Sequence, residues 1–208
     1  MIKSKDIILR DFIETDIENR IYWETVETEW QLWDAPWEYT DLTEKEKAED
    51  LKNYIENMQQ WAKQCREYSD EQERYTFQIV TNNVEQNYIG WVSSYKIDAN
   101  YNYTREDGFR AIGIDIPDIS VRGRGYSYQA LGLFIQYLLE HEENEIFTQT
   151  WSGNERMIHI VEKIGFEECC RKSGIRSVRG KVYDGLTFRL NKEKFFDFWT
   201  AHMEVMGE

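Results

Sequence analysis

The stretch IDIPDISVRGRGYSYQALGLFI, from Ile114 to Ile135, most constrains what this chain can fold into. It begins with alternating apolar residues, which are typical of a β-strand, and it ends with apolar residues at helical spacing. The residues between, Arg122 to Ser127, place two glycines and two arginines at the start of the predicted helix. This unit suggests an anion site, because a helix N-terminus presents unpaired N–H groups and the positive end of the helix dipole.

The residue types of the loop favour phosphate as its ligand. Gly123 and Gly125 lack a Cβ, so oxygens of a ligand can approach the backbone. Arg122 and Arg124 add positive charge where a pyrophosphate would lie. A Walker loop needs a lysine that is missing here. A dinucleotide-binding fingerprint needs its glycines near the start of a parallel sheet, whereas this loop follows three predicted antiparallel strands. Taken alone, a plain strand–helix turn is the better interpretation, so the decision depends on the rest of the chain.

The remaining patterns predict a mixed α+β fold. A strand at 6–12 is followed by two helices, and a capping box of Thr43 with Glu46 begins the second. Strands are then predicted at 74–82, 87–98, 109–116, 145–151, 166–180 and 181–190, with helices after Gly125, at 152–165 and at 191–205. The order β-α-α-β-β-β-α-β-α-β-β-α predicts a mostly antiparallel sheet of about seven strands, with one parallel pair splayed around a helix.

Two motifs carry a resemblance to a known family. Arg122-x-x-Gly125-x-Ser127 resembles the acetyl-CoA pyrophosphate loop of the GNAT superfamily of N-acetyltransferases. NERMIHIVEKIGF, from Asn154 to Phe166, resembles the second signature of that family. The ending VRGKVYDGLTFRL looks like the branch that contains the ribosomal-protein N-terminal acetyltransferases, RimJ and RimL. The resemblance implies a GNAT fold in one domain, 1–208, divided into acceptor-side helices and first hairpin strand at 13–90, an acetyl-CoA-binding core at 108–166 and a C-terminal helix at 191–208.

The resemblance also implies the chemistry and the cosubstrate. The expected reaction is acetyl transfer from acetyl-CoA to an amine, with no metal. The pyrophosphate would lie on the loop residues Arg122, Gly123, Arg124, Gly125, Tyr126 and Ser127. The pantetheine arm would pair with the strand around Ile116 and contact Asn154. Asn154 has a second interpretation, because it stands at a helix start where Ser152 and Glu155 match a capping box.

The catalytic groups are only partly indicated by the sequence. Attack of an amine on a thioester needs a base for the ammonium, donors for the oxyanion and a proton for the thiolate. Asp115 is the candidate base, since it lies on the strand that would flank the thioester, and the alternative is a solvent-facing carboxylate. Relatives carry their general acid where this chain has Met157 and Val161, which cannot donate a proton.

The segment EWQLWDAPWEYTD, from Glu29 to Asp41, interleaves aromatic residues with carboxylates. In the family that the chain resembles, this region forms the wall of the acceptor site. Trp33 and Asp34 are therefore predicted to bind the acceptor, because rings and carboxylates suit an organic cation. The alternative is a local aromatic cluster that pins two helices together.

Composition limits the partners. The formal net charge is -14, and residues 1–90 account for -11 of it with 21 acidic and 10 basic side chains. Such a chain is a poor candidate for nucleic-acid binding, which needs clustered cations. The negative charge suits a cationic substrate or simply keeps the protein soluble. The absence of a long apolar run argues against a membrane protein, and three unpaired cysteines favour the reducing cytoplasm. A homodimer is left open.

Two functions from different classes remain. The first is an acetyl-CoA-dependent N-acetyltransferase that acts on a protein N-terminus or a small cationic amine by direct attack in a ternary complex. The second is a CoA-binding regulatory or structural protein without catalysis, which the residues at Met157 and Val161 suggest. Release of the coenzyme thiol that depends on an acceptor distinguishes the two.

Overall fold

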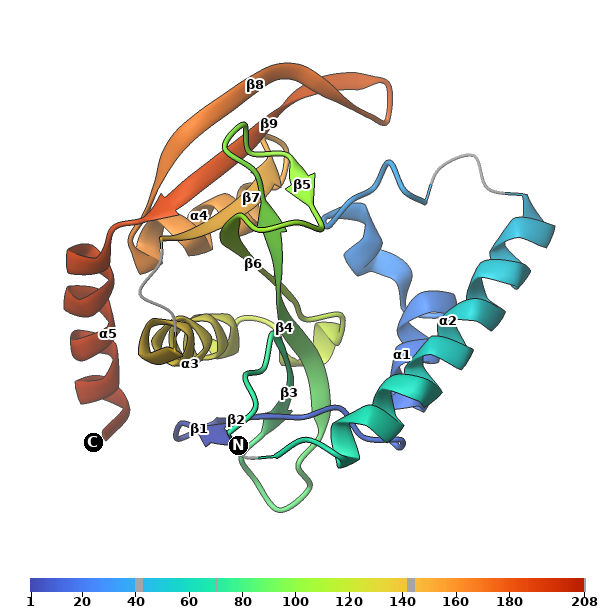
Figure 1. The fold of residues 1–208 in the computed structure, drawn as a ribbon, viewed down its shortest axis with the longest axis horizontal. Coiled ribbons are helices and arrows are strands. Elements are labelled where there is room, and N and C mark those ends of the chain that lie inside the picture. The colour runs from blue at the N-terminus through green and yellow to red at the C-terminus, as the bar shows by residue number, and fades with distance from the viewer. Residues whose placement is uncertain (40–42, 70, 142–144, 208) are drawn as a thin grey trace.

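Within residues 1–39, 43–69, 71–141 and 145–207, which the computed structural model describes, nine strands form one mixed sheet (Figure 1). In chain order they are β1 (Ile2–Lys3), β2 (Ile7–Arg10), β3 (Thr76–Thr81), β4 (Tyr88–Ile97), β5 (Tyr103–Thr104), β6 (Phe109–Asp115), β7 (Ile146–Trp151), β8 (Phe166–Val178) and β9 (Lys181–Leu190). Across the sheet the order is β1-β2-β3-β4-β6-β7-β9-β8, and β5 pairs with β4. The predicted mixed sheet is confirmed, and β1 and β5 are additions of two residues each.

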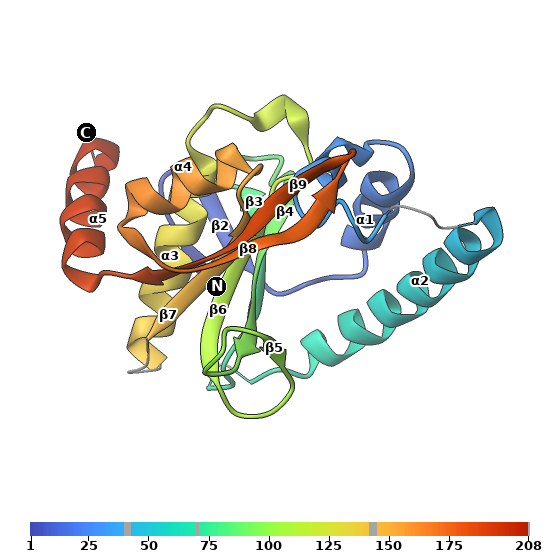
Figure 2. The same ribbon diagram turned by 90° about the horizontal axis from the view of Figure 1, so that it is seen from above.

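Helices cover both faces of the sheet. They are α1 (Asp16–Thr25), η1 (Thr28–Leu32), α2 (Glu44–Arg66), η2 (Ile119–Val121), α3 (Tyr126–His141), α4 (Glu155–Ile164) and α5 (Lys192–Gly207). In Figures 1 and 2, α3, α4 and α5 lie to one side of the sheet, and α1 and α2 lie to the other. The predicted capping box of Thr43 with Glu46 begins α2, and Gly165, with φ at 114°, ends α4. Local sequence signals therefore define these helix ends.

The gap in the sheet follows from its single parallel pair. Strands β6 and β7 pair only from Arg110–Ile112 to Ile146–Thr148. Their last residues, up to Asp115 and Trp151, then have no partner across the gap. The crossover through α3 makes this pair parallel, whereas every other pair is antiparallel. The predicted splay is therefore confirmed, and it opens the sheet beside the N-terminus of α3.

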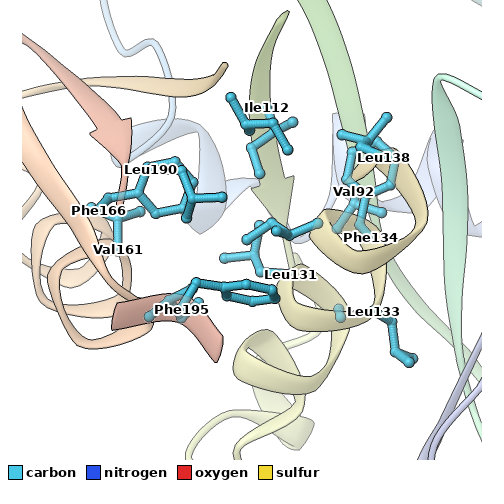
Figure 3. Close-up of a cluster of buried hydrophobic side chains, with 14 of the residues drawn as sticks. Val92, Ile112, Leu131, Leu133, Phe134, Leu138, Val161, Phe166, Leu190 and Phe195 are labelled. Carbon is cyan, nitrogen blue, oxygen red and sulfur yellow. The ribbon is translucent and has the colours of Figure 1, made fainter. Parts of the chain in front are cut away.

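The main hydrophobic core lies between the sheet and helices α3, α4 and α5 (Figure 3). The apolar residues at helical spacing in α3 form its core face, because these residues are all buried: Ala130, Leu131, Phe134, Ile135 and Leu138. Ile112 lies in the same core, and Ile114 and Ile116 pack against it. This packing holds the end of β6 and the start of α3 in a fixed relation.

A second, aromatic cluster lies on the other face of the sheet. Trp30 packs edge-on against Trp91, with ring centroids 5.5 Å apart, and Tyr39 packs against Trp30. Trp23 and Tyr88 complete the contact to α1 and β4. This part of the segment Glu29–Asp41 is therefore the structural cluster named as the alternative, and it anchors η1 beside the gap. Asp41 lies outside the described residues.

Candidate active site

A cleft of about 910 Å³ opens where β6 and β7 separate. One side consists of the end of β6 and the loop 121–128, and the other consists of β7 and the first turns of α4. The segment after α1 closes it with Trp33, Asp34 and Trp37. The segment after α1 and the region from β6 to α4, which are distant in sequence, thus line one cavity.

The glycine loop lies at the mouth of this cleft. All six predicted loop residues, from Arg122 to Ser127, line it. Gly123 and Gly125 have φ values of 76° and 78°, and a Cβ built on either would have nothing within 4 Å. Within the described residues, the backbone N–H groups from Gly123 to Ser127 have no acceptor in the chain. Open space above free N–H groups at a helix N-terminus fits the pyrophosphate of acetyl-CoA.

The predicted base lies on the far side of β6 from the main core. Asp115 lines the cleft, and the Trp91 side chain acts to lower its pKa. Burial raises the pKa of Asp115 well above its usual range, and the negative charge of Asp34 adds to the effect. The guanidinium of Arg20 acts in the opposite direction. Asp115 is therefore a partly enclosed carboxylate with increased basicity, on the face opposite Ile114 and Ile116, which pack against the main core.

Further carboxylates surround Asp115. Burial raises the pKa of Asp34 to about 6, and the charge of Glu38 adds to this effect. Burial also raises the pKa of Glu24, against the attraction of Arg20. Although Asp34 can be reached by solvent, it lies within the cleft. This end of the cleft thus has an excess of negative charge that a bound cation would compensate.

Asn154 caps α4 and also reaches the opposite wall. Its Oδ1 accepts the N–H of Met157 at 3.1 Å, and its Nδ2 donates to the Trp33 carbonyl oxygen at 2.7 Å. The capping box of Ser152 with Glu155 is wrong, because the Ser152 hydroxyl instead accepts the N–H of Asp184. Asn154 lines the cleft as predicted, with both of its polar atoms already bonded within the protein.

The positions expected to hold a general acid differ in their surroundings. Met157 lines the cleft, whereas Val161 is fully buried in the main core. Tyr126 also lines the cleft, but Tyr183 packs edge-on against Trp151 and is not part of the lining. Sequence reasoning missed Tyr95, which lines the cleft from β4 and donates to Gln149 Oε1 at 3.3 Å.

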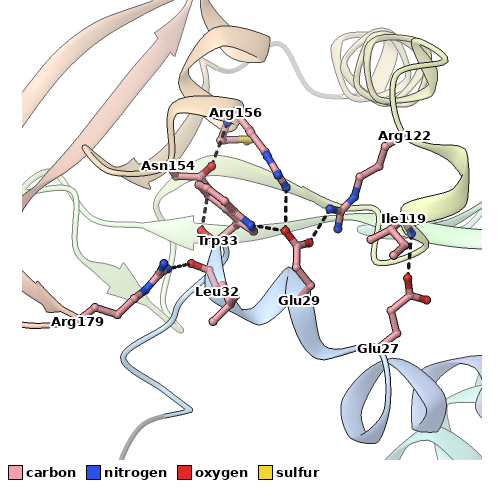
Figure 4. A network of polar contacts seen from close by, with 10 residues as sticks. Glu27, Glu29, Leu32, Trp33, Ile119, Arg122, Asn154, Arg156 and Arg179 are labelled. Carbon is pink, nitrogen blue, oxygen red and sulfur yellow. Dashed lines mark hydrogen bonds and ion pairs between the residues drawn. The ribbon is translucent and has the colours of Figure 1, made fainter.

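The ring predicted to bind a cation, Trp33, and its neighbour Trp37 each contact an arginine of the chain itself. The guanidinium of Arg156 lies 4.2 Å from the Trp33 ring centroid, and that of Arg176 lies 4.2 Å from Trp37 (Figure 4 for Trp33). Both arginines line the cleft and were missed from the sequence. The sequence holds no signal for these pairs, because each joins residues more than a hundred positions apart.

Fold and cleft together define an acetyl-CoA-dependent acetyltransferase: a sheet that splays at one parallel pair, with a phosphate-type loop beside the gap. The chain belongs to the acetyltransferase (GNAT) domain family, whose sequence pattern matches residues 6–167. Within the described ranges, no three His, Cys, Asp or Glu side chains come close enough to hold a metal ion. None of the helices described combines the length and apolar character needed to span a bilayer.

Known proteins resemble this chain at low sequence identity, one in sequence and two in fold. The SPbeta prophage-derived uncharacterized N-acetyltransferase YokL of Bacillus subtilis is 24% identical over 136 residues, which cover 64% of this chain and 73% of that protein. The ribosomal alpha-N-protein acetyltransferase RimL, in complex with coenzyme A, superposes with a TM-score of 0.59 at 13% identity, covering 89% of this chain and 94% of that one. The spermidine N-acetyltransferase from Vibrio cholerae, in complex with CoA and spermine, gives 0.60 at 15% identity, covering 93% and 99%.

Proposed function

We propose that the protein transfers the acetyl group of acetyl-CoA directly to a primary amine that carries positive charge. The observation that carries this proposal is the charge at the inner end of the cleft. Asp34 and Asp115 line the cleft, and the charge of Glu24, which is not part of the lining, also acts on Asp115. All three carboxyl groups have raised pKa values, and Arg20 is the cation that acts on Glu24 and Asp115. A bound ammonium would offset the repulsion among these carboxylates, and burial would strengthen its attraction to them.

The cosubstrate is proposed to occupy the glycine-loop side. The pyrophosphate would accept from the N–H groups of residues 123–127, and the side chains of Arg122 and Arg124 would add charge nearby. The pantetheine arm would lie along the unpaired end of β6, beside Ile116, and pass Asn154. In this arrangement residues 13–90 supply the acceptor wall, 108–166 supply the acetyl-CoA core, and 191–208 support that core from outside.

Asp115 is proposed to act as the general base. It takes a proton from the acceptor ammonium, the amine nitrogen then bonds to the thioester carbon, and the carbon–sulfur bond breaks. The nitrogen passes its second proton to the departing thiolate or to water as the amide forms. A backbone N–H of the Ile114–Ile116 stretch would donate to the oxyanion. The coenzyme thiolate can leave without a dedicated acid, because thiols of this kind have a pKa of about 8.5. Met157 and Val161 are therefore compatible with catalysis.

The acceptor class is proposed to be a small cationic amine. The acidic inner end of the cleft supports this choice, and the spermidine N-acetyltransferase among the fold neighbours acts on such a molecule. A protein N-terminus, the acceptor of RimL, is the other candidate. The free thiols of Cys65, Cys169 and Cys170 favour a cytoplasmic location. The net charge disfavours nucleic acid as a partner, and a homodimer remains a hypothesis.

A thiol-release assay tests the proposal. Purified protein with acetyl-CoA should release free CoA thiol when alkyl diamines are added, faster than with uncharged amines or with peptides that have a free N-terminus. Faster turnover of the peptides would move the assignment to protein N-termini. Tight CoA binding without any acceptor-dependent release would instead support the non-catalytic CoA-binding alternative.

Asp34→Asn is expected to weaken binding of a cationic acceptor by about two- to fivefold at pH 8, the range for a partly exposed ion pair. Because the pKa of Asp34 is about 6, its carboxylate is charged above that pH and neutral below it. The difference between native protein and variant should therefore disappear at pH 5. Isothermal titration of a diamine into the CoA-saturated proteins measures it. An equal difference in affinity at both pH values would show that the charge of Asp34 does not bind the cation.

A further inference from the structure

Glu29 holds together two arginines from opposite sides of the cleft (Figure 4). Its Oε2 lies 2.5 Å from Arg122 Nη1, and its Oε1 lies 3.2 Å from Arg156 Nη1. The Trp33 indole N–H also donates to Oε1 at 2.8 Å. Partial burial acts to raise the pKa of Glu29, but these donors outweigh it and the net shift is downward. The carboxylate is therefore charged throughout the neutral range.

Although they lie on opposite sides of the cleft, both arginines belong to the range 108–166 that is proposed to bind acetyl-CoA. Arg122 immediately precedes Gly123 in the glycine loop, and Arg156 lies in the first turn of α4, two residues after Asn154. The two guanidiniums carry two positive charges, whereas Glu29 supplies one negative charge. Guanidinium groups bind phosphate with paired hydrogen bonds, so the same pair suits the phosphates of the cosubstrate.

A phosphate group and the Glu29 carboxylate cannot both hold this pair without repulsion. Both are anions that use the same N–H donors, and like charges at this spacing disfavour each other. We propose that Glu29 is an internal competitor for the phosphates of acetyl-CoA at Arg122 and Arg156. The inference rests on the proposed function of the cleft and adds a role for Glu29, which lies outside the glycine loop.

Release of Glu29 would also act on the acceptor wall. Glu29 lies in η1, and the same segment carries Trp33, whose carbonyl oxygen accepts from Trp151 Nε1 at 2.9 Å and from Asn154 Nδ2. The Trp33 ring stacks on the Arg156 guanidinium that Glu29 pairs with. When a phosphate takes over Arg156, both contacts of this segment to the arginine change together. Cosubstrate binding is thereby coupled to the position of the acceptor wall, and the coupling is reciprocal.

Glu29→Gln removes the competing charge and keeps an oxygen that can accept from Trp33. CoA should bind this variant about 5–50-fold more tightly than the native protein, within the usual range of coupling between sites. Acetyl-pantetheine, which has no phosphate, should bind both proteins equally. Glu27→Gln is the matched control, because Glu27 lies two residues away and accepts the Ile119 N–H instead of pairing with an arginine. Its CoA affinity should stay within about twofold of native.

Isothermal titration of each variant decides the proposal, with thermal unfolding as the check on folding. In an Arg156→Gln background, the tightening caused by Glu29→Gln should shrink, because one of the two contested cations is missing. Unchanged or weaker CoA binding by folded Glu29→Gln would overturn the internal competition, as would equal tightening for acetyl-pantetheine. If the native protein binds no CoA at all, the proposed function fails as well, so the two failures are distinguishable.

Discussion

Asp115→Asn is expected to lower kcat/KM at pH 7 by about 10²–10⁴-fold, the usual contribution of a general base. The amide keeps the size of the side chain and removes its negative charge. CoA affinity should remain within about twofold of native, since the proposed arrangement places the acceptor on the side of β6 that carries this carboxylate. Steady-state kinetics with a diamine, together with titration of CoA, measure both quantities.

The dependence of kcat/KM on pH separates a base from a merely attractive charge. With an ionised Asp115, the native enzyme can use the abundant ammonium form, so kcat/KM should level off once Asp115 has lost its proton. Because burial raises the pKa of Asp115, this carboxylate is protonated in acid and the native rate falls there. The variant needs amine that is already neutral. Its kcat/KM should rise about tenfold per pH unit towards the pKa of an alkylamine, about 10.

Asp118→Asn is the matched control for this experiment. Asp118 lies three residues further along the same segment, where its carboxylate accepts from the Ser120 N–H at 2.9 Å, a bond that asparagine can keep. Its pH profile should coincide with the native one. If Asp115→Asn keeps the native profile and loses only affinity for the acceptor, Asp115 is a binding residue and the base lies elsewhere.

The glycine loop and the helix ends could be predicted because their signals are local. Gly123, Gly125 and Gly165 all have positive φ, a conformation that glycine adopts without steric cost, and they stand where the sequence changes from one pattern to another. The short strands β1 and β5 could not be predicted, because two residues carry no alternation. The parallel pair followed from the order of elements, since a strand–helix–strand connection favours that arrangement.

The wall of the cleft shows where sequence reasoning fails. Trp33 was chosen for its ring and Asp34 for its charge, and both line the cleft. The partners that fix the Trp33 ring, Glu29 and Arg156, depend on packing between η1 and α4. Asn154 also differed from one prediction, since it caps α4 in place of Ser152. Ser152 and Asn154 were both candidates to cap the N-terminus of α4. The hydroxyl of Ser152 accepts the N–H of Asp184 in β9, and Asn154 caps the helix.

The phosphate-loop assignment predicts a large loss of cosubstrate affinity in Gly125→Ala. A Cβ at this position meets nothing within 4 Å in the protein and would instead point into the space where a phosphate oxygen approaches. Loss of one hydrogen bond to a charged group is worth about 1.5–3 kcal/mol, so CoA should bind about 10–150-fold more weakly. Titration of CoA measures this directly. When CoA is present at 100 times its Kd, the native protein should also gain about 2.7 kcal/mol of stability against unfolding. The variant should gain much less at the same CoA concentration.

Gly180→Ala separates the effect on the ligand from strain in the backbone. Gly180 lies in the turn between β8 and β9, has φ at 75°, and likewise has nothing within 4 Å of a built Cβ. Alanine should therefore cost each protein a similar amount, about 1–2 kcal/mol, because both positions have positive φ. Gly180 does not line the cleft, so CoA affinity should stay native in that variant. If both variants lose stability alike and Gly125→Ala still binds CoA with native affinity, the phosphates do not rest on this loop, and the helix N-terminus would be only a structural turn.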